Sequence, residues 1–303
     1  MKWNKLGLFL KDISLGSWHA SHYSVPIGEV VENNFLRVYI SGRDELNRSY
    51  TTSVVLDFEK NFKLVEVASS PILSPGRNGQ FDDSGAMATW MYKKENGENF
   101  MYYIGWNLSK EVPFRNSIGL ALSNKNKLSF TKFSNGPILD RSIFDPGFVA
   151  SCAVEKVNDE YYMWYLSCDD WIFTNGSYKA KYNIKLAKSS DLINWARSGV
   201  VCIDFTSSKE YAISRPSVIK EGDIFKMWYS VKGQSYKIGY AESSDGIHWV
   251  RKDEQVGIST SENGWDSEMI EYPHVLEIKS QKYMIYNGNG YGIDGIGIAV
   301  SEE

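Results

Sequence analysis

The sequence lacks any long apolar run. Nowhere in its 303 residues does an unbroken apolar stretch approach the roughly 18 residues that a membrane-spanning helix needs. The amino-terminal segment MKWNKLGLFLKDISLGSWHA has only a short apolar stretch and no small-residue cleavage pattern, unlike a secretory signal. We therefore expect a soluble protein of the cytoplasm that does not act at a membrane.

An excess of positive charge is also absent. The chain carries 33 Lys and Arg against 37 Asp and Glu, which gives a formal net charge of −4. Proteins that bind nucleic acid usually gather lysine and arginine to displace counterions from the phosphates. The charge balance therefore argues against a nucleic-acid partner, and it gives no indication of the oligomeric state.

Cysteine is scarce and has no metal-site spacing, so we expect small buried thiols in a reducing compartment. The three cysteines are Cys152, Cys168 and Cys202. His19 and His22 have no convincing third ligand, so no metal site is predicted. The glycine-rich run from Gly288 to Gly295 lies between predicted strands and opens no helix, which argues against a nucleotide site. No cofactor is expected.

What the sequence does contain is a repeat. One short string occurs five times, as LRVYISGRD from 36, FMYYIGWN from 100, YYMWYLSCDD from 161, FKMWYSVKGQ from 225 and KYMIYNGNGY from 282. A second string follows most copies, as in IGLALSNKNKLSFTKF from 118 and IGYAESSDGIHWVRK from 238. A third precedes each copy, as in ISRPSVIKEGD and IEYPHVLEIKS. Each unit of about sixty residues thus holds four short alternating strands, which is typical of a propeller blade.

The last copy ends at IGIAVSEE, before its fourth strand, and the amino-terminal KWNKLGLFL matches the missing element. Trp3 then takes the place that Trp195 and Trp249 have in their copies, and the added strand removes an open sheet edge. We predict a single all-β domain over residues 1–303, a five-bladed β-propeller with four antiparallel strands per blade, closed by the N-terminal strand. The expected blades are 17–74, 75–140, 141–204, 205–259, and 260–303 together with 2–10.

Propeller topology predicts which loops lie together on the same face of the molecule. The innermost strand of each blade starts on one face, the loop between the second and third strands returns there, and ligands favour that end of the channel. We expect on this face the strand entries 18–24, 81–87, 144–151, 209–215 and 265–272, with the loops 42–50, 105–117, 168–182, 231–237 and 287–295. The hairpins with Asp191 and Asp245 fall on the opposite face, where each Asp suits a turn that bonds its own backbone.

Regularity separates the scaffold from the site. An aromatic residue followed by Asp recurs at Asp82, Asp145 and Asp266, and a feature repeated three times is predicted to be structural. Polar residues that break the repeat are better candidates for a site. The catalytic candidates are Asp83, Asp170 and Glu271. The candidate ligand contacts are His22, Arg43, Asp44, Trp106, Trp171, Arg215 and Tyr272.

The repeated sequence pattern MWYSxxG followed by IGxAxSxDGxxW resembles that of the five-bladed propellers of glycoside hydrolase families 43, 32 and 130, and the resemblance covers nearly the whole chain. Family 43 enzymes carry a base Asp, an orienting Asp and an acid Glu on successive inner strands, whereas HASHYS stands here in place of the first Asp. The family 32 signature NDPNG is absent, and only FDPG at Asp145 is similar to its later RDP motif. Family 130 includes phosphorylases that act on mannosides, and related propellers are glycosyltransferases. The resemblance therefore implies a carbohydrate-active protein.

Cleavage of a glycosidic bond needs a protonated carboxyl for the leaving oxygen and a carboxylate that activates water or becomes the nucleophile. We predict Glu271 as the general acid, because its apolar and aromatic neighbours favour desolvation and a raised pKa. Asp83 is predicted as the base. In the structural alternative, Glu271 pairs with Arg215 across neighbouring blades.

Two further groups are candidates for contacts with a carbohydrate partner. Arg43 and Arg215 suit a phosphate or a sugar carboxylate because a guanidinium is a flat bidentate donor, although each also suits a structural ion pair. Trp106 and Trp171 offer aromatic faces for a pyranose ring. Three functions remain open, in this order: a glycoside hydrolase, a propeller transferase or phosphorylase that acts on sugar phosphates or nucleotide sugars, and a non-catalytic glycan-binding module.

Overall fold

The computed structural model describes residues 1–32, 34–123 and 129–302, and it is all-β as predicted. Residues 124–128, which belong to the second string of the repeat, lie outside this range. The strands are β1 (Lys2–Leu10), β2 (Ser21–Glu32), β3 (Phe35–Arg43), β4 (Ser49–Asp57), β5 (Lys63–Val67), β6 (Gly85–Lys93), β7 (Asn99–Leu108), β8 (Phe114–Ser123), β9 (Thr131–Lys132), β10 (Phe148–Val157), β11 (Glu160–Thr174), β12 (Ser177–Ser189), β13 (Ala196–Ile203), β14 (Ala212–Glu221), β15 (Ile224–Lys232), β16 (Tyr236–Ser243), β17 (Val250–Arg251), β18 (Glu271–Ile278), β19 (Gln281–Asn287) and β20 (Ile296–Glu302).

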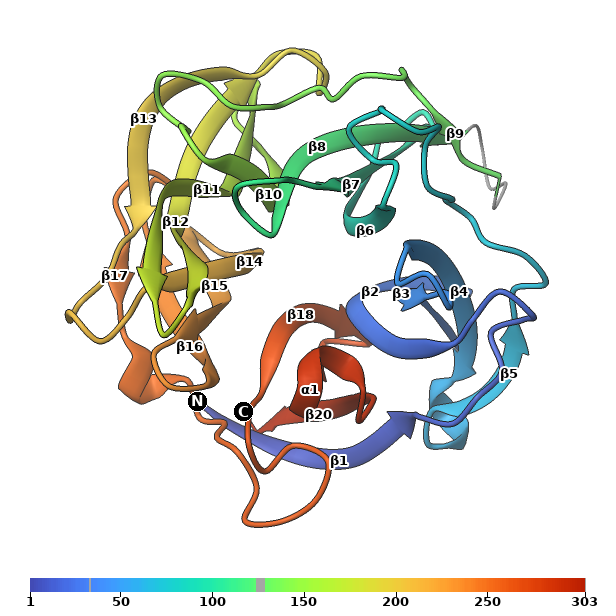
Figure 1. The fold of residues 1–303 in the computed structure, drawn as a ribbon. Coiled ribbons are helices and arrows are strands. Elements are labelled where there is room, and N and C mark those ends of the chain that lie inside the picture. Colours follow the sequence, from blue (N-terminus) through green and yellow to red (C-terminus); the bar gives the residue numbers. More distant parts are fainter. Residues whose placement is uncertain (33, 124–128, 303) are drawn as a thin grey trace.

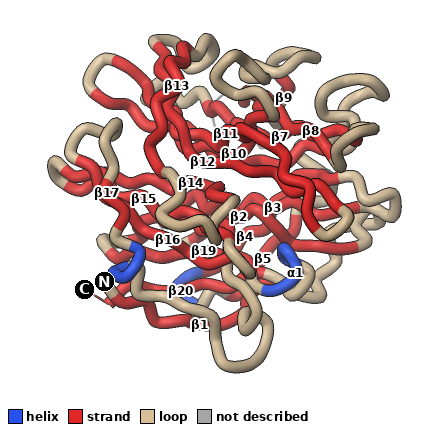
Figure 2. The backbone as a smooth tube through the Cα atoms, turned by 60° about the vertical axis from the view of Figure 1, so that its left-hand side comes forward, coloured by secondary structure: helices blue, strands red, loops and turns tan. Residues whose placement is uncertain are grey.

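Among the described residues, helical structure is confined to short segments between strands, as Figure 2 shows. These segments are η1 (Phe58–Lys60), η2 (Asp253–Gln255) and α1 (Asn289–Gly292). In α1 the residues Gly290 and Tyr291 have left-handed φ angles of 66° and 58°, so the glycine-rich run forms a turn between β19 and β20, as expected. In the described part of the chain, no helix combines the length and hydropathy needed to cross a membrane.

The strands follow the chain in sets of four that are joined into three hydrogen-bonded sheets. One sheet has the order β2-β3-β4-β6-β7-β8-β9 with β5 on β4, and another has β10-β11-β12-β14-β15-β16-β17 with β13 on β12. The third sheet is β1-β20-β19-β18. Figure 1 shows the sets arranged around a central opening, with β2, β6, β10, β14 and β18 nearest to it. The first strand of each set therefore positions the residues at the centre.

Strand β1 is the outer strand of the last set, which confirms the sequence prediction for residues 2–10. It pairs antiparallel with β20, from Lys2 opposite Glu302 to Leu10 opposite Ile296. The Trp3 ring packs edge-on against Trp228, with 6.0 Å between centroids. The same contact recurs between neighbouring sets in the pairs Tyr102–Trp195 at 6.0 Å and Trp164–Trp249 at 5.8 Å. Trp3 therefore has the packing role of Trp195 and Trp249.

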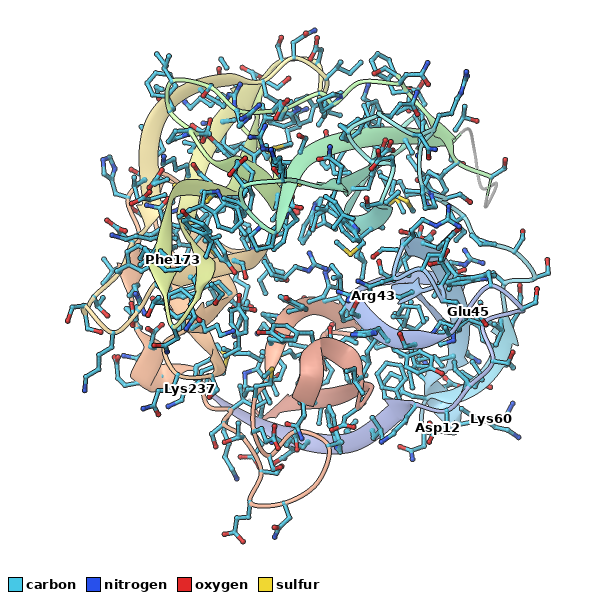
Figure 3. The ribbon with its side chains drawn as sticks, in the orientation of Figure 1. Asp12, Arg43, Glu45, Lys60, Phe173 and Lys237 are labelled. Atoms are coloured by element: carbon cyan, nitrogen blue, oxygen red, sulfur yellow. The ribbon has the colours of Figure 1, made fainter. Side chains whose placement is uncertain are left out.

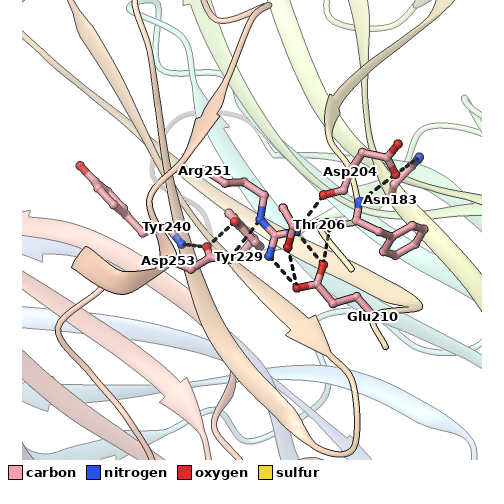
Figure 4. Close-up of polar contacts among 9 residues, drawn as sticks. Asn183, Asp204, Thr206, Glu210, Tyr229, Tyr240, Arg251 and Asp253 are labelled. Atoms are coloured by element: carbon pink, nitrogen blue, oxygen red, sulfur yellow. Dashed lines mark hydrogen bonds and ion pairs between the residues drawn. The ribbon is translucent and has the colours of Figure 1, made fainter. Parts of the chain in front are cut away.

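The three repeated aspartates are scaffold, as predicted. Each aspartate is buried and accepts hydrogen bonds from other side chains of its set. One comes from a tyrosine in the second strand of the same set, and another comes from a Lys or Arg two positions after the aromatic residue of the outer strand. The groups are Asp82 with Tyr103 and Lys132, Asp145 with Tyr165 and Arg197, and Asp266 with Tyr286 and Lys5. In the fourth set Arg251 instead binds Glu210 and Asp253, and Tyr229 donates to Asp253 (Figure 4). These hydrogen bonds and ion pairs hold each strand entry against the outer strand of the same set.

Backbone hydrogen bonds place the strand entries and the second loops on one face, as the topology predicts. The pairs are Ala20 N to Arg43 O, Ser84 N to Trp106 O, Gly147 N to Cys168 O, Tyr211 N to Lys232 O, and Asn289 N to Trp265 O. Asp191 and Asp245 lie at the other end of the strands, where each accepts backbone N–H bonds from residues two and three positions later. Hydrogen bonds hold the pKa of both carboxyls well below the usual range: those from Asn194 for Asp191 and, against the larger opposing effect of burial, those from His248 and its neighbour for Asp245. The three cysteines are buried free thiols, also as expected.

Candidate functional site

The entry of β18 has an unusual backbone that repeats in two other inner strands. Tyr272 has a φ of 54°, and Val25 and Arg215 have φ angles of 53° and 55°; a proline follows each of the three. Non-glycine residues adopt this region only when surrounding structure holds them there. A polar side chain of the preceding set accepts from each backbone N–H: Asn287 Oδ1 at 3.0 Å, Ser151 Oγ at 3.0 Å and Ser230 Oγ at 2.8 Å. The residues at this bulge therefore point in fixed directions.

Glu271 is the buried carboxyl at this entry. Its residue surface is 0% exposed, and neither carboxylate oxygen has a hydrogen-bond partner. Burial raises the pKa of Glu271 well above its usual range, and the charge of Lys232 opposes that shift only in part. A raised pKa favours the protonated carboxyl, which is the state that a general acid needs.

Three tyrosines surround Glu271, since its charge raises the pKa of Tyr182, Tyr236 and Tyr272 in addition to the larger effect of burial. The hydroxyls of Tyr182 and Tyr236 lie 2.5 Å apart, and the rings of Tyr236 and Tyr272 have centroids 6.0 Å apart. The acid is therefore close enough to tyrosines from three different strand sets to affect their pKa values.

Cations lie beside these tyrosines. Lys232 Nζ donates to Tyr291 Oη at 2.6 Å and lies 4.8 Å from the centroid of the Tyr236 ring. Arg43 lies at the central opening (Figure 3). Its charge opposes part of the rise in the pKa of Tyr272, as expected for a near neighbour. Burial, Arg43 and His19 together lower the pKa of His22 to about 4, so this imidazole is neutral at pH 7. The cluster thus combines one acid, several phenols and two permanent cations.

Arg215 is buried across the centre and does not pair with Glu271, so the structural alternative of an Arg215–Glu271 pair is wrong. Its guanidinium donates to Thr89 O in β6 and, at 2.7 Å, to Pro26 O in β2. Both acceptors belong to strand sets other than its own. Arg215 therefore braces the centre through backbone carbonyls and presents no exposed guanidinium to a ligand.

The remaining carboxylate candidates are used locally. Asp83 accepts from Gly79 N and Ser84 Oγ, and Asp170 accepts from Trp171 N. Asp44 is the centre of its loop and accepts from Leu46 N, Arg48 and Tyr50 Oη. Among the described residues no hydrogen bond, ion pair or electrostatic effect on Glu271 comes from Asp83 or Asp170. Their catalytic roles stay predictions.

The two candidate tryptophans differ in their surroundings. Trp106 is half-buried and donates from Nε1 to Ser49 Oγ at 3.2 Å. Trp171 packs against Phe114 and Phe148, with centroids 5.5 and 5.6 Å apart, and Phe148 in turn lies 6.1 Å from Tyr182. Trp171 is therefore connected to the tyrosines around Glu271 by ring contacts.

Sequence reasoning missed Lys232, Tyr182, Tyr236 and Tyr291 as individual site residues. The predicted loops 168–182, 231–237 and 287–295 do contain them or end at them. The available signal was that Tyr182 and Tyr236 take the same place in the third and fourth copies, opposite Cys168 and Lys232, where the first and second copies have Ser49 and Asn116.

A cavity of about 300 Å³ lies away from this cluster, near the two chain ends, with Lys226, Glu242, Lys282 and Glu302 in its lining. The lysines there are paired with Glu221. No group of three or more potential metal-ligating side chains occurs within the described ranges.

No protein-family model matches the chain. Over 302 residues, covering all of both chains, it is 35% identical to two proteins of Mycobacterium tuberculosis, the uncharacterized proteins MT1551 and Rv1502.

Solved structures with the same fold are glycoside hydrolases and their relatives. A thermostable family-43 glycoside hydrolase has a TM-score of 0.69 at 18% identity, covering 93% of this chain and 89% of that one. A structure from the GH130 family of mannoside phosphorylases, which contains glycoside hydrolases, has a TM-score of 0.69 at 15% identity, covering 94% and 85%. A glycosyl hydrolase from Bacteroides ovatus has a TM-score of 0.70 at 16% identity, covering 94% and 85%. The resemblance in fold to the propeller glycoside hydrolases is therefore confirmed.

Proposed function

We propose that this chain, which belongs to the same protein family as MT1551 and Rv1502 of Mycobacterium tuberculosis, cleaves a glycosidic bond with Glu271 as general acid. The observation that carries the proposal is the environment of Glu271. It is a fully buried carboxyl without a hydrogen-bond partner, set among tyrosines at the strand entries. Strongly perturbed carboxyls of this kind are concentrated at catalytic sites.

The finer description of the fold is part of the proposal. We propose that the five sets of four strands are the blades of one closed five-bladed propeller over residues 1–303, with β1 as the last strand of the fifth blade. The recurring edge-on aromatic contacts and the Asp–Tyr–cation groups support equivalent blades. We also retain the cytoplasm as the proposed location.

In the proposed reaction the proton of Glu271 passes to the glycosidic oxygen as the bond between that oxygen and the anomeric carbon breaks. The hydroxyls of Tyr182 and Tyr236 lie 2.5 Å apart, and the charge of Glu271 affects the pKa of both tyrosines, so we propose that the sugar binds beside this pair. Hydrolysis also needs a carboxylate that activates water, and Asp83 is the proposed base. Removal of a positioned general acid typically lowers a rate by about a hundredfold or more.

Phosphorolysis is a second candidate, and one observation favours it. The charged neighbour of Glu271 is Lys232, and Arg43 lies beside Tyr272, whereas no second carboxylate of the described residues affects Glu271. A phosphate held by these cations would attack the anomeric carbon through one oxygen, while the leaving oxygen takes the Glu271 proton. This route needs the acid but no basic carboxylate.

A screen of aryl glycosides with and without inorganic phosphate tests both candidate reactions. Sugar phosphates and nucleotide sugars are included in the screen as donor substrates to test for glycosyl transfer. Once turnover is found, Glu271→Gln should lower kcat by about a hundredfold or more while the thermal midpoint changes little. Glu155→Gln is the control, because Glu155 also lies on an inner strand and has a raised pKa, while among the described residues it is not one of the groups that affect Tyr182, Tyr236 or Tyr272.

Phosphate-dependent turnover would favour phosphorolysis over hydrolysis. A Glu271→Gln enzyme that turns over at the normal rate would refute the assignment of the acid. If every substrate is inert while glycans still bind, the non-catalytic module becomes the better description.

A further inference from the structure

One hairpin extends well beyond its set of strands. Strands β11 and β12 have 15 and 13 residues and stay paired to Thr174 opposite Ser177. The turn between them uses Asn175 and Gly176 with φ angles of 51° and 76°, the left-handed pair that suits a tight two-residue hairpin. The projection is therefore a regular structural element.

The two faces of this hairpin differ. Directly opposed residues of paired strands share a face, so Phe173 and Tyr178 lie together with Trp171 and Tyr182. On the other face, Lys179 lies 5.6 Å from the Tyr211 ring and Lys181 5.4 Å from the Phe205 ring. The lysine face thus rests on the segment before β14.

The aromatic face is open at its tip and joined to the site at its base. The rings of Phe173 and Tyr178 have centroids 5.1 Å apart, yet the two residues are 63% and 43% exposed. At the base, Tyr182 reaches the hydroxyl of Tyr236 beside Glu271. Figure 3 labels Phe173 on this hairpin. From Tyr178 to Tyr182 the strand advances about 13 Å, at roughly 3.3 Å per residue.

We propose that the aromatic face of the β11–β12 hairpin binds the distal sugar units of a glycan whose scissile bond lies at Glu271. This inference rests on the proposed function. Pyranose rings have apolar C–H faces that pack on aromatic rings, and tyrosine adds a hydroxyl for hydrogen bonding. Because the face is longer than one pyranose ring and begins at the tyrosines over Glu271, the ligand is an oligosaccharide or longer chain.

The test compares substrates of different length in the full-length protein. The double variant Phe173→Ala/Tyr178→Ala removes the tip rings, and Ile172→Ala is the matched control, since Ile172 is 39% exposed on the opposite face of the same hairpin. The probes are 4-nitrophenyl monosaccharides and manno-, xylo- and arabino-oligosaccharides of two to six units. For oligosaccharides, the double variant should lose about tenfold in kcat/KM, as expected when two ring contacts are removed. Monosaccharide turnover and the Ile172→Ala variant should be unchanged.

Calorimetric titration of the Glu271→Gln variant with the same oligosaccharides separates the two proposals, because binding to the hairpin does not need the acid. We expect affinity to rise with chain length and this rise to disappear when the tip rings are removed. Equal losses for short and long probes, or no binding of any oligosaccharide, would overturn the inference. A dimer in light scattering that becomes a monomer in the double variant would identify the face as a contact between copies and also overturn it.

Discussion

Replacing Trp3 by alanine tests whether the amino-terminal strand holds the last set of strands together. Trp3 is 5% exposed and its ring packs on Trp228, while Leu10 at the other end of β1 is fully buried. Between them, Lys5 forms an ion pair of 2.6 Å with the buried Asp266. The indole is thus the first of several buried contacts that join residues 2–10 to the carboxyl-terminal strands.

Truncation of a buried tryptophan typically costs about 3–5 kcal/mol of unfolding free energy. The lower end applies here, because Trp3 Nε1 is buried without a hydrogen-bond partner and its removal relieves that unmet donor. About 3 kcal/mol corresponds to a fall in Tm of about 5 °C for a protein of this size. Leu6→Ala is the control on the same strand, since Leu6 is 44% exposed and should change Tm by no more than about 1–2 °C.

Circular dichroism during heating and urea unfolding both measure the difference. A chain that starts at Asp12 should be far less stable than Trp3→Ala, because it also loses the Lys5 ion pair and the burial of Leu10. If that truncated chain and Trp3→Ala unfold at the temperature of the full protein, the structural role assigned to β1 is refuted.

Two further predictions concern buried charges. Arg215→Met should lower the unfolding free energy by about 3 kcal/mol in urea titrations, because the carbonyls of Thr89 and Pro26 lose their donor. An unchanged urea midpoint would show that Arg215 does not stabilise the centre. Burial raises the pKa of Glu155 from 4.5 to about 7, so the folded state binds the extra proton and stability falls as the pH rises from 4.5 through 7. Glu155→Gln should therefore raise Tm at pH 8 but not at pH 4, and an equal shift at both values would contradict this reasoning.

The fold was predictable because the information that specifies it is repeated. Alternating apolar residues identify each strand, and five copies of one string indicate that the strands come in equivalent sets. The position of Trp3 relative to Trp195 and Trp249 was enough to assign β1, because all three rings fill the same kind of gap against a neighbouring set. Glu271 was selected in the same way, as a carboxyl that breaks the repeat, and its catalytic role stays a prediction.

The direction of Arg215 was not predictable from this pattern. Strand periodicity assigns alternate residues to opposite sides, but a bulge with a left-handed residue resets that alternation locally. Arg215 lies at such a bulge, between Ser214 and Ser217, so its side chain crosses the centre and is not displayed to a ligand. The contact of Tyr182 with Tyr236 joins residues 54 positions apart in the sequence, and a repeat says nothing about which side chains meet between neighbouring sets.

The pairing of β1 with β20 has a consequence for how the protein is made. A ribosome delivers β1 long before its partner β20, since the ladder joins Lys2 to Glu302. Until β20 emerges the nascent chain therefore carries a strand without its partner, and Asp266 emerges long after Lys5, the cation that neutralises it. Long-range pairings of this kind form slowly and leave strand edges exposed to aggregation in the meantime. The last sheet can be completed only after β20 has emerged from the ribosome.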